Sequence, residues 1–260
     1  MTLESRALTF TYGAESVLTD IDLVIPEGRI TALVGANGSG KSTILKNLAR
    51  LLKPTRGSVV IDGKDIHTMG SKEVARRISI LPQKPEAPDG LRVAELVAYG
   101  RFSWQSPLAQ LNAIDRAKIS SALELTGMTR FAERELSTLS GGQRQRAWIA
   151  MALAQDSGTM LLDEPTTFLD LAHQFEVLTL LRSLNTERDK TIVMVLHDLN
   201  QAASFADNMI VVSNGRLLRH GPPSEVMVPE VIAEAFGVVV DFIEDRKSGN
   251  RLVVPVALIE

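Results

Sequence analysis

A glycine-rich segment constrains the fold of this chain more than any other feature. It reads "GANGSGKS", from Gly35 to Ser42, and it lies between the apolar run "RITALV" and the amphipathic stretch "STILKNLARLL". Glycines at this spacing let the backbone curl so that its amide groups face a phosphate group. The pattern G-x-x-x-x-G-K-[ST] is complete and lies between a predicted strand and a predicted helix, as its chemistry requires. The sequence therefore predicts a phosphate site at the carboxyl end of a buried strand.

The side chains of this loop indicate a nucleoside triphosphate bound with a metal ion. Lys41 would reach the β- and γ-phosphates, and the Ser42 hydroxyl would ligate Mg²⁺. The residues expected to contact the nucleotide here are Gly35, Asn37, Gly38, Ser39, Gly40, Lys41, Ser42 and Thr43.

Two acidic residues end a second predicted strand. In "TMLLDEP" the apolar residues 160–162 form a buried strand that carries Asp163 to its carboxyl end, where ligands bind in open α/β sheets. Asp163 would hold the Mg²⁺ ion. Glu164, beside it, would polarise an attacking water as a general base. A surface acid pair is the plain alternative, but a complete phosphate loop in the same chain disfavours it.

Three further residues have positions that suit a nucleotide site but do not require one. Gln83 ends the predicted strand "ISILPQ", and His197 ends "VMVLHD". The ring of Tyr12 could stack on a base or belong to the core. The remaining histidines are isolated, and we expect them at the surface: His67, His173 and His220.

A second helix start in the chain also suits an anion. In "LSGGQRQRAW", Ser140 is a favourable N-cap, and the glycines after it leave backbone amides open. One nucleotide already has its phosphates bound by the first loop. The segment is therefore either an ordinary capped helix, or a contact to a nucleotide held by a second copy in a two-fold dimer.

The order of the predicted elements indicates an α/β fold. Buried strands alternate with amphipathic helices, which predicts a parallel sheet, and "DIDLVIPEG" alternates as an N-terminal, half-buried strand does. Residues 42–52 should form one helix with its leucines on a single face. We expect a core in residues 1–84 and 156–225, a helical subdomain in 85–155, and a C-terminal extension in 226–260 with two strands around a polar turn.

Composition excludes several classes of function. The net charge of -3 argues against a nucleic-acid partner, and the absence of cysteine excludes disulfides and thiolate chemistry. No apolar run approaches the roughly 18 residues of a membrane-spanning helix. The N-terminus lacks the pattern of a secretory signal. We expect a cytoplasmic protein.

The ordered motifs closely resemble the ATP-binding subunit of ATP-binding-cassette (ABC) transporters over nearly the whole chain. The resemblance implies an α/β ABC-type ATPase domain of the P-loop NTPase class, with a parallel sheet core, an N-terminal antiparallel part and an inserted helical subdomain. It implies ATP and Mg²⁺ as ligands and a head-to-tail homodimer with two shared ATP molecules. The motifs that carry it are Tyr12, "GANGSGKST", Gln83, "LSGGQ", "MLLDEP", "FLD" at 168–170 and His197.

The resemblance also assigns roles to individual residues. Tyr12 would stack on adenine, and Gln83 would join the Mg²⁺ ligands and link the metal site to the membrane partner. His197 would contact the γ-phosphate, and Asp170 would lie at the dimer interface. The residues expected at the γ-phosphate bound by the opposite subunit are Ser140, Gly141, Gly142 and Gln143. Ala36 replaces the usual proline of the family, with little effect expected because it contributes only backbone.

A narrower resemblance is to the ATPase subunits of ferric-siderophore importers, with haem and cobalamin importers close behind. It is carried by segments such as "LSGGQRQRAWIAMALAQ" and "LLDEPTTFLDLAHQ". Residues 84–107 would meet a separate membrane permease, with Phe102 and Trp104 either at that contact or in the lobe core. The subunit would then lie peripherally on the cytoplasmic face of the membrane and depend indirectly on an extracytoplasmic binding protein.

Other classes of protein fit less well. Soluble ABC ATPases that act on DNA or ribosomes carry a coiled-coil insertion or tandem cassettes, whereas this chain has one copy of each motif. A metabolic kinase or a GTPase does not explain "LSGGQ", and the guanine motif N-K-x-D is absent. Exporters usually fuse the cassette to membrane helices, which the sequence does not indicate here, although separate exporter subunits exist.

Overall fold

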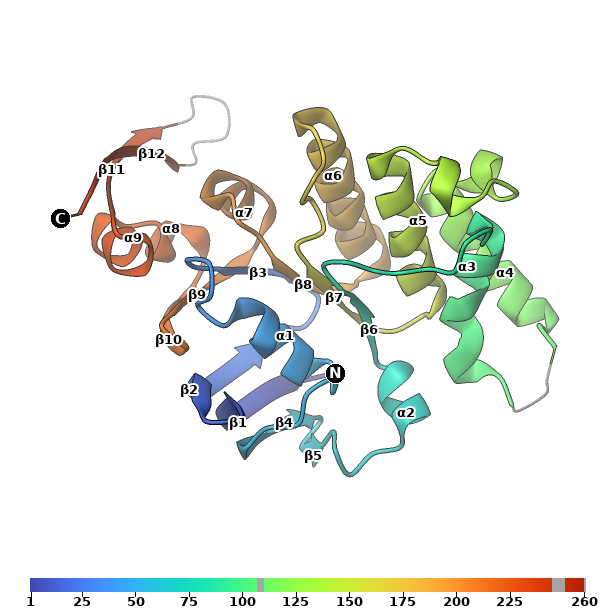
Figure 1. The fold of residues 1–260 in the computed structure, drawn as a ribbon, viewed down its shortest axis with the longest axis horizontal. Coiled ribbons are helices and arrows are strands. Elements are labelled where there is room, and N and C mark those ends of the chain that lie inside the picture. The colour runs from blue at the N-terminus through green and yellow to red at the C-terminus, as the bar shows by residue number, and fades with distance from the viewer. Residues whose placement is uncertain (107–109, 245–250, 260) are drawn as a thin grey trace. The chain divides into compact units, whose positions relative to one another are not determined.

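The computed structural model describes residues 1–106, 110–244 and 251–259 (Figure 1). The chain divides into two compact units, one made of residues 1–68 and 191–260 and the other of residues 69–190. The first unit thus joins both ends of the chain, and the second is a single continuous stretch.

An antiparallel sheet forms the N-terminal part of the first unit. Its central strand β1 pairs with β2 on one side and with β4 on the other. In β2 the residues Ile21, Leu23 and Ile25 are buried and alternate with exposed ones, as the sequence predicted. The strands are β1 (Leu3–Tyr12), β2 (Glu15–Ile25), β4 (Arg56–Ile61) and β5 (Lys64–Asp65), in the order β2-β1-β4-β5.

A largely parallel group of strands forms the rest of the first unit's core. Strand β3 lies between β8 and β9 and is parallel to both, whereas β10 pairs antiparallel with β9. All residues of β3 and β8 are buried, which explains why these strands read as continuous apolar runs. Their bounds are β3 (Ile30–Val34), β8 (Thr191–Val195), β9 (Asn208–Ser213) and β10 (Arg216–Gly221).

Helix α1 is shorter than the sequence predicted. It spans Lys41–Leu48 rather than continuing to Leu52. Arg50 adopts a positive φ of 60°, which ends the helix, and Leu51 is 58% exposed instead of lying on the buried face. The prediction was wrong there because a leucine pattern does not show where the backbone turns.

The remaining helices of the first unit pack against its later strands. Asn200 in α7 exchanges two hydrogen bonds with the backbone of Val253, which attaches β12 to α7. Strand β12 pairs antiparallel with β11; the turn expected between them, in 245–250, lies outside the described residues. The elements are α7 (Leu199–Phe205), α8 (Pro223–Val226), α9 (Pro229–Phe236), β11 (Val238–Glu244) and β12 (Arg251–Leu258).

The second unit combines a pair of parallel strands with helices. Strands β6 (Ile78–Leu81) and β7 (Thr159–Asp163) pair in parallel. Helices α3 and α4 both pack against α5. The helices are α2 (Ser71–Ala75), α3 (Val93–Tyr99), α4 (Ala113–Leu125), α5 (Gly141–Ala154) and α6 (Leu171–Arg188), with short 3-10 turns η1 (Gly100–Trp104), η2 (Thr129–Phe131) and η3 (Leu136–Thr138).

A buried ion pair ties the helices of this unit together. The Arg101 guanidinium lies 3.0 Å from the Asp115 carboxylate and also donates to the Ala154 carbonyl at 2.8 Å. Both charged side chains are 3% exposed. Gly100, next to Arg101, ends α3 without a left-handed φ, and a Cβ there would lie 2.3 Å from the Met151 carbonyl oxygen. Gly100 is therefore required by close packing against α5.

Within the described part of the chain, no helix combines the length and apolar character needed to cross a bilayer.

Candidate nucleotide-binding site

The phosphate loop, residues 35–42, leaves β3 and enters α1. Gly35 and Gly40 have φ angles of 150° and 106°, which L-residues rarely adopt. A Cβ at Gly35 would lie 2.1 Å from the Val212 carbonyl oxygen, and one at Gly40 would lie 2.6 Å from Leu18 Cδ2. Both conformation and space therefore require glycine at these positions.

The loop presents donors that suit a phosphate group. Lys41 Nζ donates to the carbonyls of Gly35 and Ala36 at 2.9 and 2.8 Å, which holds the buried ammonium against the loop. Ser39 Oγ is buried and has no hydrogen-bond partner among the described residues. Helix α1 has no side-chain cap and no acidic residue in its first turn, so its N-terminal amides favour an anion. These features fit the triphosphate that the sequence predicted.

His197 emerges at the same sheet edge as the phosphate loop. Strands β3 and β8 are parallel neighbours, and Leu33 pairs with Val195. Both strands therefore end together, with the exposed His197 two residues beyond β8. Tyr12 ends β1 in the same unit; the residue is 49% exposed, and its ring meets the Phe10 ring edge-on with 4.8 Å between the ring centroids. This exposure leaves Tyr12 accessible to a ligand.

The second unit brings Gln83 and the acidic pair to one sheet edge. Leu81 of β6 pairs with Leu162 of β7, so Gln83 and Asp163 follow parallel strands at the same end. Asp163 is 2% exposed. Glu164 has a φ of 53°, which turns the chain directly after the strand, and its Oε2 accepts a hydrogen bond from Thr167 Oγ1 at 2.9 Å. Thr167 thereby orients the carboxylate expected to act as the base.

The signature segment, Ser140–Gln143, is a capped helix start. Ser140 Oγ accepts from the Gln143 amide at 3.3 Å, and Gln143 Oε1 accepts from the Ser140 amide at 3.2 Å. This reciprocal capping box begins α5 where the sequence predicted. Ser140 and Gly141 are exposed, whereas Gly142 is buried. The segment therefore caps its own helix and still leaves Ser140 and Gly141 exposed to a ligand.

The start of α6 contains a pair that the sequence did not predict. Asp170 caps α6, and its Oδ1 accepts from the His173 backbone amide at 2.9 Å and lies 2.7 Å from His173 Nδ1. Hydrogen bonds from the backbone amide and then the ring of His173 lower the pKa of Asp170 below its usual value. The expectation that His173 is an isolated surface residue was therefore wrong. The available signal was its spacing of three residues from an N-cap aspartate.

The other two isolated histidines differ from each other. His220 is exposed, as predicted. His67 is half-buried, and its Nε2 is buried without a hydrogen-bond partner in the described part of the chain. Burial lowers the pKa of His67, against the opposing effect of Asp65. The prediction of an exposed residue was therefore wrong for His67.

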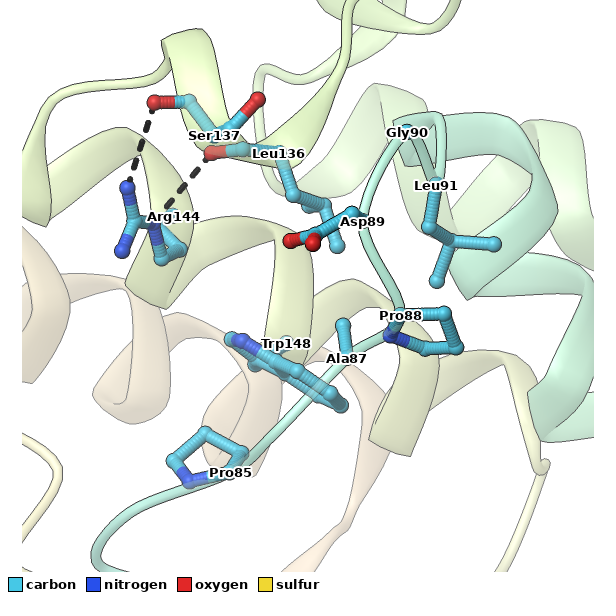
Figure 2. Close-up of a pocket in the computed structure, with 10 residues that line it drawn as sticks. All are labelled: Pro85, Ala87, Pro88, Asp89, Gly90, Leu91, Leu136, Ser137, Arg144 and Trp148. Atoms are coloured by element: carbon cyan, nitrogen blue, oxygen red, sulfur yellow. Dashed lines mark hydrogen bonds between the residues drawn. The ribbon is translucent and has the colours of Figure 1, made fainter.

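A separate pocket of about 160 Å³ lies beside the segment that follows Gln83 (Figure 2). Arg144 borders it and donates to the carbonyls of Leu136 and Ser137 at 3.2 and 3.4 Å. The lining residues are Pro85, Ala87, Pro88, Asp89, Gly90, Leu91, Leu136, Ser137, Arg144 and Trp148. Further along the chain Phe102 is 70% exposed, whereas the Trp104 indole donates to the Gln155 carbonyl at 2.7 Å.

Comparison with known families identifies the chain. Residues 18–167, more than half of its length, match the family described as ABC transporter. The chain belongs to the ABC transporter family. As an ABC ATPase it has the α/β fold and the ATP-hydrolysing class of activity that the motifs predicted.

Individual ABC proteins match this ATPase over most of its length. It is 48% identical to the iron(3+)-hydroxamate import ATP-binding protein FhuC of Bacillus subtilis (strain 168), covering 99% of this chain and 96% of the relative. It is 45% identical to the ferric enterobactin transport ATP-binding protein FepC of Escherichia coli (strain K12), covering 97% and 93%.

Solved ABC structures resemble it as well. An inward-facing putative metal-chelate type ABC transporter aligns with a TM-score of 0.86 at 29% identity and covers 98% of this chain and 97% of that chain. A dimeric bacterial ABC transporter cassette aligns with a TM-score of 0.75 at 32% identity, covering 85% and 98%.

Proposed function

We propose that this chain is the ATP-hydrolysing subunit of an importer that takes up a ferric siderophore through a separate permease. One observation carries the proposal: a chain with the full set of ABC ATPase motifs matches, from end to end, relatives named for iron(3+)-hydroxamate import and ferric enterobactin transport. The metal-chelate transporter among the structural neighbours supports the same class of cargo.

The phosphate loop and the strand-end residues would act on one nucleotide. Lys41 and the loop amides would bind the phosphates, and Tyr12 would stack on adenine. Oxygen donors are what Mg²⁺ prefers, and Ser42, Gln83 and Asp163 supply hydroxyl, amide and carboxylate oxygens. When bound, Mg²⁺ neutralises charge on the β- and γ-phosphate oxygens.

Glu164 would drive hydrolysis by taking a proton. A water would attack the γ-phosphorus while its proton passes to the Glu164 carboxylate, and ADP would leave with the bridging oxygen. His197 would donate to the γ-phosphate. The hydrogen bond from Thr167 supports this role because it fixes one carboxylate oxygen and thereby orients the other.

The signature segment would serve a nucleotide held by a second copy. Its exposed Ser140 and Gly141 at a helix start suit the γ-phosphate of that nucleotide, and Gly142, Gln143 and Asp170 would complete the interface. The resemblance to a dimeric cassette supports a two-fold dimer. ATP would then close the dimer, and loss of the γ-phosphate would open it.

The permease would contact residues 84–107, of which 84–106 are described. The pocket in Figure 2 supplies a concave surface beside the first part of this segment, and Phe102, further along it, supplies an exposed apolar side chain; both suit a contact with a helix of the partner. We place this contact within a helical subdomain of residues 85–155, with a core in 1–84 and 156–225 and an extension in 226–260. The subunit would work at the cytoplasmic face of the membrane.

Uptake of radiolabelled iron tests the proposal. Cells that lack this gene would be offered iron as several ferric siderophores and complemented with the wild type or with Glu164→Gln. We expect uptake of one chelate class to return with the wild type alone, because the variant lacks the base. If cells that lack the gene take up every chelate as well as cells that carry it, the protein does not serve iron uptake. Haem and cobalamin uptake would then be measured in the same cells.

A further inference from the structure

The glycine that begins the buried part of α5 is required by a side chain from another helix. Gly142 has an ordinary helical φ, so its backbone does not need glycine. A Cβ at Gly142 would lie 2.4 Å from His173 Cδ2, 2.9 Å from Cγ and 3.2 Å from Cβ. The first two separations are too short for any real Cβ contact. The His173 ring therefore packs flush against the Gly142 backbone.

The ring of His173 is held in that place by Asp170. Asp170 Oδ1 accepts one hydrogen bond from the His173 backbone amide and a second from the ring Nδ1. An ionised carboxylate only accepts hydrogen bonds, and its lowered pKa keeps Asp170 ionised at neutral pH. The proton must therefore lie on Nδ1, which fixes the tautomer and the orientation of the ring.

The contact joins two segments that are about thirty residues apart in the sequence, the start of α5 and the start of α6. Gly141, next to Gly142, also lies near the same loop, since an added Cβ would be 3.5 Å from Leu169 Cδ2 and 4.0 Å from the Phe168 carbonyl oxygen. The start of α5 thus rests on the loop that leads into α6. The three atoms nearest to a Cβ at Gly142 all belong to His173, so this one side chain sets the space there.

We propose that His173 is a positioning residue. It fixes the signature segment, Ser140–Gln143, against residues 168–170, so that both segments contact the second copy in a fixed mutual arrangement. The inference rests on the proposed role of the signature segment in a dimer. It adds a residue that the family motifs do not include. Steps that need the dimer should depend on His173, whereas ATP binding by the monomer should not.

A double-mutant cycle between Gly142 and His173 tests the inference. The variants Gly142→Ala, His173→Ala and the pair would be made in the full chain, and kcat and ATP affinity measured. Gly142→Ala should lower kcat at least about tenfold, because the new Cβ displaces the ring. His173→Ala should also lower kcat, and the pair should lose no more than His173→Ala alone, because the Cβ at position 142 then has no ring to meet. Monomer ATP affinity should stay within about twofold in all three.

Two further variants separate positioning from loss of structure. His173→Asn keeps a donor at the position of Nδ1 and should retain more kcat than His173→Ala. His220→Ala removes an exposed histidine of β10 and should leave kcat unchanged. A melting temperature that falls in parallel with kcat across the series would assign His173 a structural role and overturn the inference.

The outcomes distinguish this inference from the proposed function. If Glu164→Gln dimerises with ATP but the cycle is additive, Gly142 and His173 act independently, and only the role of His173 fails. If Glu164→Gln remains monomeric with ATP, the dimer itself fails, and the inference fails with it.

Discussion

Lys41 is the residue on which nucleotide affinity should depend most. Its ammonium is buried against the phosphate loop, where a charge-assisted hydrogen bond to phosphate contributes about 1.5–3 kcal/mol. Lys41→Ala should therefore weaken ATP binding by at least about tenfold in a titration with fluorescent ATP. Lys46→Ala, in the last turn of the same helix, is the matched control and should bind normally. Equal affinity of both variants would exclude Lys41 from the site.

Single residues were predictable where their role depends on nearby sequence. The glycines of the phosphate loop have the strained φ angles that the motif requires, because the loop sets its own geometry. His173 could not be predicted in this way, since its partner Gly142 is in a different helix. Contacts between elements leave little trace in a local pattern.

At the scale of elements, the Arg101–Asp115 pair should be the most sensitive contact in the second unit. Removing one partner leaves a buried charge uncompensated, so Asp115→Ala should lower the free energy of unfolding by about 3–5 kcal/mol. Asp115 also accepts from the Asn112 amide at the start of α4, which adds to the loss.

An exposed pair supplies the control for that prediction. Arg92 and Glu133 lie 3.1 Å apart with both side chains largely exposed, and Glu133→Ala should cost less than about 1 kcal/mol. Denaturant unfolding of the two variants would measure the difference. Similar losses of stability in both would contradict a buried, stabilising role for Arg101.

The types of element followed from the sequence better than their ends did. Buried strands such as β3 and β7 and the capped start of α5 came out as predicted, because periodicity and capping are local signals. The end of α1 did not, because Arg50 turns the chain while the leucine pattern continues. The sequence also did not show why position 100 needs glycine, because the reason is close packing against α5.

For the whole molecule, the sequence predicted one nucleotide site, and within each unit the structure brings some of the expected residues to one sheet edge. The phosphate loop and His197 share one edge in the first unit, and Gln83 and Asp163 share another in the second. Parallel strands explain this grouping, because their carboxyl ends coincide. Contact of each residue with ATP or Mg²⁺ remains a prediction.

The oligomeric state of Glu164→Gln in the presence of ATP tests the shared nucleotide site most directly. The variant should bind ATP, turn it over slowly and sediment as a dimer, because both nucleotides remain intact between two copies. Adding Ser140→Arg to the same chain should abolish the dimer while leaving monomer ATP affinity nearly unchanged. A Glu164→Gln protein that stays monomeric with saturating ATP, or a Ser140→Arg change that removes monomer affinity, would contradict the account.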